Sequence, residues 1–382
     1  MKSFWGIGLF VMFGLLTAAA IGFYSYLPAD PLVYDDEQTG LHEDIVIKFS
    51  YSVAENTPKG QAAEKFKHLV ENKTGNRVHV ELFPNASLYN ESDEMEALHN
   101  GNVQMIAPSF SNIAEAIPEW MVMDLPFAYP NEEAVMAAFQ GRIGEEMKKS
   151  AEQQGMIAMA FWGNGFRQIT SSNAAIVHPQ DVRNRKMRIQ PSLVIQEQYR
   201  SLGATTYPLP FNQIYRNVEN GTVDAEENTI SNIYSKRLYE VQQYLTVTNH
   251  SYLGYGVLMN RQFWEELPPD LQRQIQSAME ETERWANRNA TDINRKQWSS
   301  IQESSGMEII YPDERTLQEW RTAWTPLYEQ FNAAIGPELI DEVKHLQREY
   351  DSQTPAWVST DDTDNPSKFF GQNDLHRFIF EY

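Results

Sequence analysis

Residues 45–82 change their hydrophobic period twice, and this change constrains the fold more than any other feature of the chain. From Ile45 to Val53 every second residue is apolar or aromatic, which is the period of a half-buried strand. Thr57 and Pro58 then form a helix start, and a stripe of 3.6-residue period follows up to Gly75. Residues 78–82 alternate again. A strand, a helix and a strand in this order predict a crossover connection and a parallel strand pair.

The same alternation of helix and strand signals continues along the chain. It predicts helices over 92–101, 144–153 and 193–202, and strands over 103–107, 156–162, 186–189, 205–207, 222–225 and 252–259. We therefore expect an α/β fold.

Residues 270–304 contain no Gly or Pro and carry one apolar face. They predict a helix of about 35 residues, roughly 50 Å long. Such a helix is longer than one domain needs, so we expect it to brace two lobes. A strand over 307–310 and helices over 314–331 and 337–350 should follow.

The N-terminus carries an apolar run of 24 residues, from Phe4 to Leu27. A membrane-spanning helix needs about 20 such residues, whereas a cleavable signal core has about 7–15. Ala18 and Ala20 offer a cleavage motif, but cleavage there would leave an apolar end exposed. We favour a signal-anchor over a removed signal peptide for residues 1–27, and either one places the remaining chain outside the cytoplasmic membrane. Residues 28–44 read as an acidic linker, and residues 351–382 as a tail that packs weakly or mediates an interaction.

Composition excludes several classes of function. The chain has 31 basic and 52 acidic residues and a net charge of −21, which repels nucleic acids. It has no cysteine, so disulfides, thiol catalysis and lipidation of an N-terminal cysteine are excluded. No nucleophile-elbow, zinc-protease, phosphate-loop or dinucleotide motif occurs. We predict no enzyme, no cofactor and no metal site.

Arginine and amide positions indicate a binding site instead. Arg167 follows the strand that ends at Trp162, and ligand crevices form at strand ends in α/β sheets. Arg188 lies inside the strand over 186–189, where a guanidinium must pair with an acid or face a cleft. Glu226, Glu227 and Asn228 follow the strand over 222–225. An ordinary surface ion pair is the alternative interpretation for each arginine.

Ten short stretches between positions 54 and 250 form one ordered pattern: Ala54-Glu-Asn-Thr-Pro-Lys-Gly60, Pro108-Ser109, Asp124-Leu-Pro-Phe127, Gly165-Phe-Arg-Gln168, Lys186-Met-Arg188, Leu202-Gly-Ala204, Phe211-Asn-Gln-Ile-Tyr215, Val223-Asp224, Glu227-Asn228 and Thr248-Asn-His250. Through them, residues 45 to about 350 resemble the solute-binding proteins of TRAP (tripartite ATP-independent periplasmic) transporters, in the dicarboxylate-binding branch. Arg188 and Phe211 precede Asn228 by 40 and 17 residues, as in that family.

The resemblance implies a two-lobed periplasmic-binding-protein-like fold with a cleft between the lobes and a long bracing helix. Residues 45–166 and 256–300 would form lobe I, and residues 167–255 and 301–350 would form lobe II.

The resemblance also implies the roles of the site residues. Arg188 should hold the ligand carboxylate in a two-pronged salt bridge, Arg167 and Asn228 should orient it, and Phe211 should pack against it. Lys59 is a candidate for a second carboxylate. Ser109 and His250 are weaker candidates, because Ser109 could simply cap a helix and His250 could be a satisfied strand residue.

We therefore predict a monomeric receptor that captures a small organic anion, in the first place a C4-dicarboxylate such as succinate, malate or fumarate, and delivers it to TRAP membrane permease subunits. One alternative is a monocarboxylate, keto acid or sugar acid as ligand, and another is a membrane-tethered sensor that contacts a histidine kinase. The family usually reads D-G-Q-E-N where this chain has Asp224-Ala-Glu-Glu-Asn228, and Y-x-A-L-Q-x-G where it has Tyr215-Arg-Asn-Val-Glu-Asn-Gly221. These changes add acid near an anion site and leave the ligand's identity open.

Overall fold

The longest strand, β4 (Met156–Ser171), is shared by the two halves of one sheet. Its first part pairs with β9 (Tyr252–Asn260), and its last part pairs with β7 (Ala225–Thr229) and β8 (Tyr244–Thr246), in each case antiparallel. The strand order is β2-β1-β3-β9-β4-β7-β5-β6, and β10 pairs with β8. The structure, a computed structural model, describes residues 12–14, 17 and 45–351.

The other strands are β1 (Ile45–Ser50), β2 (Val78–Phe83), β3 (Met105–Ile106), β5 (Lys186–Ile189), β6 (Thr205–Pro208) and β10 (Glu308–Ile310). The α-helices that precede β7 are α2 (Pro58–Lys73), α3 (Glu94–His99), α4 (Phe110–Ala114), α5 (Glu132–Gln140), α6 (Arg142–Gln153), α7 (Leu193–Arg200) and α8 (Ile214–Glu219). Those that follow it are α9 (Ile230–Ser235), α10 (Arg261–Glu266), α11 (Pro269–Ser304), α12 (Glu314–Trp324), α13 (Pro326–Gln330), α14 (Asn332–Ile335) and α15 (Pro337–Asp351). Short 3-10 helices lie at η2 (Pro118–Asp124), η3 (Pro179–Val182), η4 (Phe211–Gln213) and η5 (Leu238–Glu240).

The predicted strand–helix–strand unit is confirmed. The strands β1 and β2 pair in parallel, and α2 connects them. The side chain of Thr57 accepts a hydrogen bond from the Gly60 amide and caps the helix. Gly75 lies just beyond the end of α2 with a φ of 61°, in the left-handed region that glycine adopts most easily.

The strand β4 extends nine residues beyond the predicted end at Trp162, so Arg167 lies inside a strand and not at its end. The predicted strand ends just before Gly163-Asn-Gly165, but helix α11 holds this stretch extended. Asn287 accepts a hydrogen bond from the Gly163 amide at 2.6 Å, and Asn294 donates one to the carbonyl of Asn164 at 2.6 Å. These contacts lie far apart in sequence, and local patterns do not show them.

The strand β7 also differs from the prediction. It covers 225–229 in place of 222–225, so Glu226, Glu227 and Asn228 are strand residues that are almost fully buried. Consecutive charged residues are rare in a buried strand, which explains why the sequence suggested a strand end here. Among the other predicted elements the differences are small: helix α3 begins two residues after Ser92, and Pro326 divides the predicted helix over 314–331 into α12 and α13. The strand β8 and the helices α5, α8, α9, α10 and α14 were not predicted.

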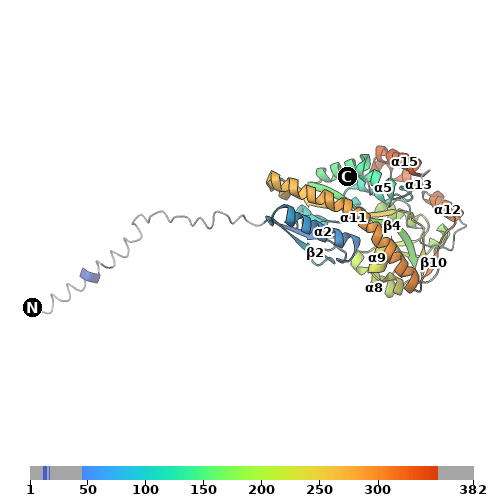
Figure 1. Cartoon of the computed structure of the whole chain (residues 1–382). Helices are drawn as coiled ribbons and strands as arrows, with labels where there is room; N and C mark the ends of the chain where they lie inside the picture. Colours follow the sequence, from blue (N-terminus) through green and yellow to red (C-terminus); the bar gives the residue numbers. More distant parts are fainter. Residues whose placement is uncertain (1–11, 15–16, 18–44, 352–382) are drawn as a thin grey trace, which may run out of the picture. The chain divides into compact units, whose positions relative to one another are not determined.

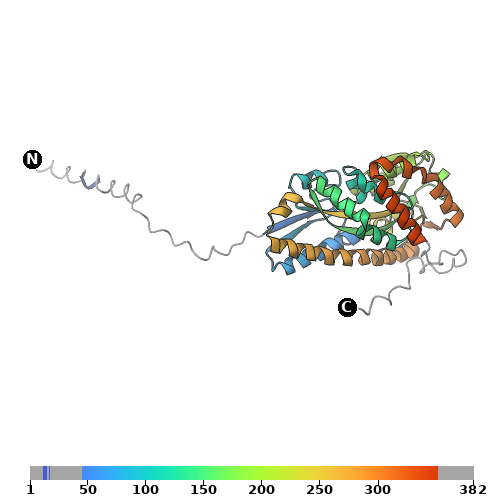
Figure 2. The same cartoon turned by 90° about the horizontal axis from the view of Figure 1, so that it is seen from above.

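Helices cover both faces of the sheet (Figures 1 and 2). A hydrophobic core lies on each face. Phe161 and Trp162 are neighbours on β4, and they enter different cores because successive strand residues face opposite ways. One core lies under α2, α8, α9 and α11, and the other under α4 to α7 and α12 to α15. The predicted long helix is confirmed as α11, which has 36 residues and runs along β4.

Contacts divide the chain into residues 1–44 and 45–382, and the fold described above belongs to the second unit. The predicted linker over 28–44 and the tail over 352–382 lie outside the described residues, as does most of the apolar run over 4–27. Among the described residues, no helix is both long enough and apolar enough to cross a membrane.

Candidate ligand-binding site

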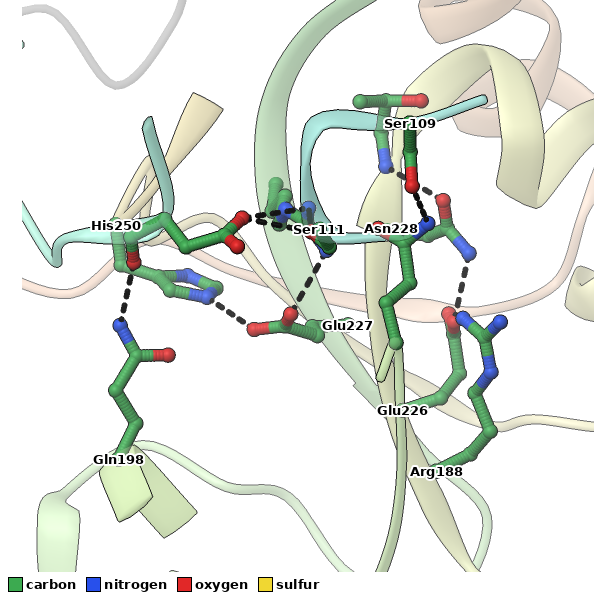
Figure 3. A network of polar contacts seen from close by, with 12 residues as sticks. Ser109, Ser111, Arg188, Gln198, Glu226, Glu227, Asn228 and His250 are labelled. Atoms are coloured by element: carbon green, nitrogen blue, oxygen red, sulfur yellow. Dashed lines mark hydrogen bonds and ion pairs between the residues drawn. The ribbon is translucent and has the colours of Figure 1, made fainter. Parts of the chain in front are cut away.

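Three neighbouring strands bring Arg188 and Asn228 to one face of the sheet. Arg188 on β5 is in register with Glu226 on β7, and Glu226 is in register with Thr170 on β4. Asn228 lies two residues further along β7 and therefore faces the same side. Figure 3 shows Arg188, Glu226 and Asn228 together on one side of β7.

Arg188 is buried, and its guanidinium is hydrogen-bonded to a backbone carbonyl. Its Nε and Nη2 donate to the carbonyl of Leu209 at 2.9 and 2.7 Å, and its side chain is 1% exposed. Among the residues that the structure describes, no carboxylate lies within ion-pair distance of this guanidinium. Burial lowers the pKa of Arg188, while the more distant charges of Glu91 and Glu226 raise it.

Glu226 is hydrogen-bonded to its strand neighbours and not to Arg188. Its Oε1 lies 2.8 Å from the Thr170 hydroxyl, and its Oε2 accepts from Asn228 Nδ2 at 2.9 Å. Burial raises the pKa of Glu226 more than the nearby Arg188 lowers it. Asn228 is itself fixed by Asn232, whose Nδ2 donates to the Asn228 side-chain oxygen at 2.7 Å.

Arg167 belongs to a second cluster on the other face of β7. Its Nη1 donates to Glu227 Oε1 at 2.9 Å, and its Nη2 donates to the Ser111 hydroxyl at 3.0 Å. Asp124 Oδ1 lies 3.6 Å from the same guanidinium and accepts a hydrogen bond from Ser111. The protein itself thus compensates the charge of Arg167 with two buried carboxylates.

Glu227 is the centre of this second cluster. Tyr199 donates to its Oε2 at 2.7 Å, and His250 Nε2 lies 2.8 Å from the same oxygen. Burial opposes the ionisation of Glu227, but Arg167 and the hydrogen bonds from His250 and Tyr199 outweigh it and hold the pKa at about 2.

His250 uses both of its ring nitrogens within the protein. Its Nδ1 lies 2.6 Å from the Thr248 hydroxyl, and its Nε2 meets Glu227. The ring packs on Trp324, with a centroid distance of 5.5 Å. In this arrangement His250 holds Glu227 in place.

Lys59 lies at the start of α2 and is buried. Its Nζ donates to the carbonyl of Ala107 at 2.9 Å and lies 4.1 Å from the centroid of the Tyr255 ring. Burial lowers the pKa of Lys59 to about 8, against the attraction of Glu94 and Glu91. Glu94 is fully buried and, within the described part of the chain, neither of its oxygens has a hydrogen-bond partner.

Glu91 connects two segments that are distant in sequence. Ser52, just after β1, donates to its Oε1 at 2.9 Å, and the backbone amide of Phe211 donates to its Oε2 at 2.8 Å. The ring of Phe211 lies under Lys236, whose Nζ is 4.7 Å from the ring centroid.

Ser109 caps helix α4, as one of its two interpretations predicted. Its hydroxyl accepts from the Asn112 amide at 3.3 Å and from Gln190 Nε2 at 2.8 Å. Gln190 directly follows β5, two residues after Arg188, so this hydrogen bond ties Ser109 to the end of the strand that carries Arg188.

The seven predicted residues are all buried, with exposed fractions of 5% or less. Sequence reasoning missed the carboxylates around them, Glu91, Glu94, Glu226 and Glu227, and the hydroxyl of Tyr199. Only Glu226 and Glu227 left a signal, as acids next to a predicted anion site. Within the described residues, no cluster of His, Asp or Glu could hold a metal ion.

Comparison with known proteins agrees with this architecture. Residues 49–334 match the family model of the bacterial extracellular solute-binding proteins, family 7. The C4-dicarboxylate-binding protein DctB of Bacillus subtilis is 42% identical over 349 residues, which cover 91% of this chain and all of that protein.

Two solved structures share the fold. A TRAP periplasmic solute-binding protein from Shewanella oneidensis, with bound succinate, has a TM-score of 0.77 and 32% identity, covering 79% of this chain and 99% of that one. A sugar acid binding protein from Advenella mimigardefordensis, in complex with galactonate, has a TM-score of 0.77 and 28% identity, covering 80% and 98%.

The fold and the family match thus define a two-lobed solute-binding protein and not an enzyme. The chain belongs to family 7 of the bacterial extracellular solute-binding proteins, and it works outside the cytoplasmic membrane. The predicted fold class, the family and the non-enzymatic function are confirmed.

Proposed function

We propose that the protein captures a C4-dicarboxylate, such as succinate or malate, for a TRAP transporter. Arg188 holds one carboxylate together with Asn228, Phe211 packs against the carbon chain, and Lys59 meets the second carboxylate. The similarity to DctB of B. subtilis and to the succinate-bound protein of S. oneidensis supports this ligand class.

The observation that carries the proposal is the buried guanidinium of Arg188, which has no carboxylate within ion-pair distance among the described residues. A buried charge without a partner at contact distance costs several kcal/mol, about 3–5 when a buried pair is broken. A ligand carboxylate recovers that cost, because the planar guanidinium can bind both of its oxygens. Asn228, next to Arg188 on the same face, can donate to the same group.

The other predicted residues take different parts. Arg167 on β4 remains a proposed ligand contact, because its buried Nε has no hydrogen-bond partner among the described residues. Ser109 positions Gln190 beside Arg188, and His250 positions Glu227.

The buried site requires an opening motion before a ligand can enter. We assign residues 45–166 and 256–300 to one lobe, and residues 167–255 and 301–350 to the other. Glu91, which bonds Ser52 in the first and Phe211 in the second, would then close the cleft. The loaded, closed form is the one that the membrane permease would recognise.

The apolar run over 4–27 is proposed to anchor the protein in the membrane, since the chain has no cysteine for a lipid anchor. The protein should stay in washed membrane fractions after salt and carbonate extraction. An N-terminus at Ile21 in the mature protein would disprove the anchor.

A thermal-shift panel tests the ligand, with succinate, malate, fumarate, lactate, pyruvate and aldarates. A ligand at 100 times its Kd adds about 2.7 kcal/mol to the folded state. Arg188→Lys keeps the positive charge but loses the planar guanidinium that can bind both carboxylate oxygens, so it should abolish the thermal shift. Stabilisation by aldarates alone would favour the sugar-acid alternative, which the likeness to the galactonate-bound protein supports.

A further inference from the structure

The carboxyl group of Glu226 lies next to the proposed position of the ligand carboxylate. It occupies the centre of a row across three strands, between Thr170 on β4 and Arg188 on β5. It is fully buried, and it is hydrogen-bonded to Asn228, the amide proposed to meet the ligand. An incoming carboxylate on Arg188 and Asn228 would therefore approach an existing carboxyl group.

The hydrogen bonds around Glu226 fit a group that can carry a proton. The Thr170 hydroxyl lies 2.8 Å from Glu226 Oε1 and 2.6 Å from Gln242 Oε1, but it has one hydrogen to donate. If that hydrogen goes to Gln242, the contact with Glu226 requires a proton on Glu226. If Glu226 is ionised, the Gln242 amide must turn and offer Nε2, which has no partner within the described part of the chain. The three side chains can thus serve both protonation states.

We propose that Glu226 is a proton-controlled counter-ion of Arg188, which takes up a proton when a carboxylate ligand binds. When Glu226 is ionised, its negative charge offsets the positive charge of Arg188 and repels the ligand carboxylate. When Glu226 is neutral, it leaves the full charge of Arg188 to the ligand. The inference rests on the proposed function, because it places the ligand carboxylate on Arg188.

The charged groups around Glu226 determine whether ligand affinity rises or falls with pH. Arg188 faces Glu226 from β5, and Arg167 and Glu227 lie on the other face of β4 and β7. Glu91 faces Arg188 from the loop before α3, and the charge of Glu226 also reaches Tyr199 on α7. Lys236, directly after α9, lies over the ring of Phe211, and the charge of Glu91 reaches it. Burial already raises the pKa of Glu226, and a second anion on Arg188 would raise it further. Ligand affinity should therefore rise as the pH falls, by up to about tenfold per pH unit.

The experiment compares the full chain with Glu226→Gln, which keeps the shape and removes the titration. Succinate affinity is measured by calorimetry from pH 6.5 to 8.5. Both proteins share the titration of succinate and of all other groups, so the ratio of their Kd values isolates Glu226. We expect the ratio to change in favour of Glu226→Gln as the pH rises, by up to about tenfold per pH unit. In buffers of different ionisation enthalpy, the wild type should take up more protons on binding than the variant.

Two additions keep the test decisive. Thr170→Val removes a donor to the ionised form, so it should shift the pH dependence to higher pH, an effect that loose packing would not produce. Glu303→Gln, at an exposed position of α11, controls for the change of net charge and should behave as the wild type. Equal pH dependence of the wild type and Glu226→Gln would overturn the proposal.

A readout without ligand separates this proposal from the proposed function. In pH-difference infrared spectra of the ligand-free protein, the carbonyl band of a protonated carboxyl group should titrate in the wild type and be missing in Glu226→Gln. If that band is present but no organic acid binds, the ligand proposal fails and the protonation of Glu226 stands. If the band is absent, Glu226 does not carry the proton and this inference is wrong.

Discussion

Neutralising Glu227 should lower the stability of the protein in a pH-dependent way. Glu227→Gln keeps the shape of the side chain but removes the charge that Arg167, Tyr199 and His250 stabilise. The fall of the Glu227 pKa from its ordinary value of 4.5 to about 2 corresponds to about 3 kcal/mol, at about 1.4 kcal/mol for each pH unit.

The sign follows from the direction of the pKa change. A carboxyl group whose pKa is lower in the folded state stabilises the fold above its unfolded pKa, and this contribution is lost as the pH falls through the folded pKa. The difference in unfolding free energy between the wild type and Glu227→Gln should therefore be about 3 kcal/mol above about pH 5 and shrink towards pH 2.

Urea unfolding followed by tryptophan fluorescence at pH 7, 5, 4 and 3 measures this difference. The midpoint of the variant should fall by about 1 M urea at pH 7. The exposed control Glu303→Gln should leave the midpoint unchanged. A loss of stability that is the same at every pH would show that the side chain acts through its shape, and the electrostatic reasoning would be refuted.

Three further predictions concern the arginines, one glycine and the net charge. Arg167→Met leaves Glu227 and Asp124 without their partner and should lower the unfolding free energy by about 3–5 kcal/mol. Arg188→Met should leave the unfolding free energy unchanged or raise it, while calorimetry should show that succinate binding is lost. The opposite pattern would exchange the roles of the two arginines. Gly60→Ala places a Cβ 2.3 Å from the carbonyl oxygen of Ala54 and should cost about 1–3 kcal/mol in urea unfolding; unchanged stability would mean that this turn can relax. Added salt should raise the association rate of succinate in stopped-flow fluorescence, because the net charge of −21 repels the anion; a steep fall would indicate an attractive field at the cleft.

Most of the fold could be predicted where the local pattern decides the structure. The strand β5 has the predicted bounds, and α2 and α11 begin within one residue of theirs. The prediction failed where distant residues decide. The strand β4 continues through Gly163 and Gly165 because Asn287 and Asn294 on α11 hold the backbone there, and the sequence around the glycines contains no trace of that contact.

The site could be predicted in its cations but not in its anions. Arg167 and Arg188 are conspicuous because a guanidinium among apolar residues needs an explanation. Glu91 and Asp124 look like any other acids of a strongly acidic chain, and only the fold shows that they lie beside those arginines. The resemblance to a family supplied positions for the ligand contacts, but the pairing of each charge follows from the tertiary structure.

Two adjacent glutamates on β7 explain why the two arginines differ. Side chains of neighbouring strand residues face opposite sides, so Glu226 and Glu227 enter different surroundings although they follow each other in sequence. Glu227 meets Arg167 directly and accepts two more hydrogen bonds, which fixes it as an anion and uses the charge of Arg167. Glu226 meets only neutral donors at contact distance within the described residues and stays out of ion-pair range of Arg188, so burial dominates its ionisation. The strand thus compensates one guanidinium permanently and leaves the other to an anion that comes from outside.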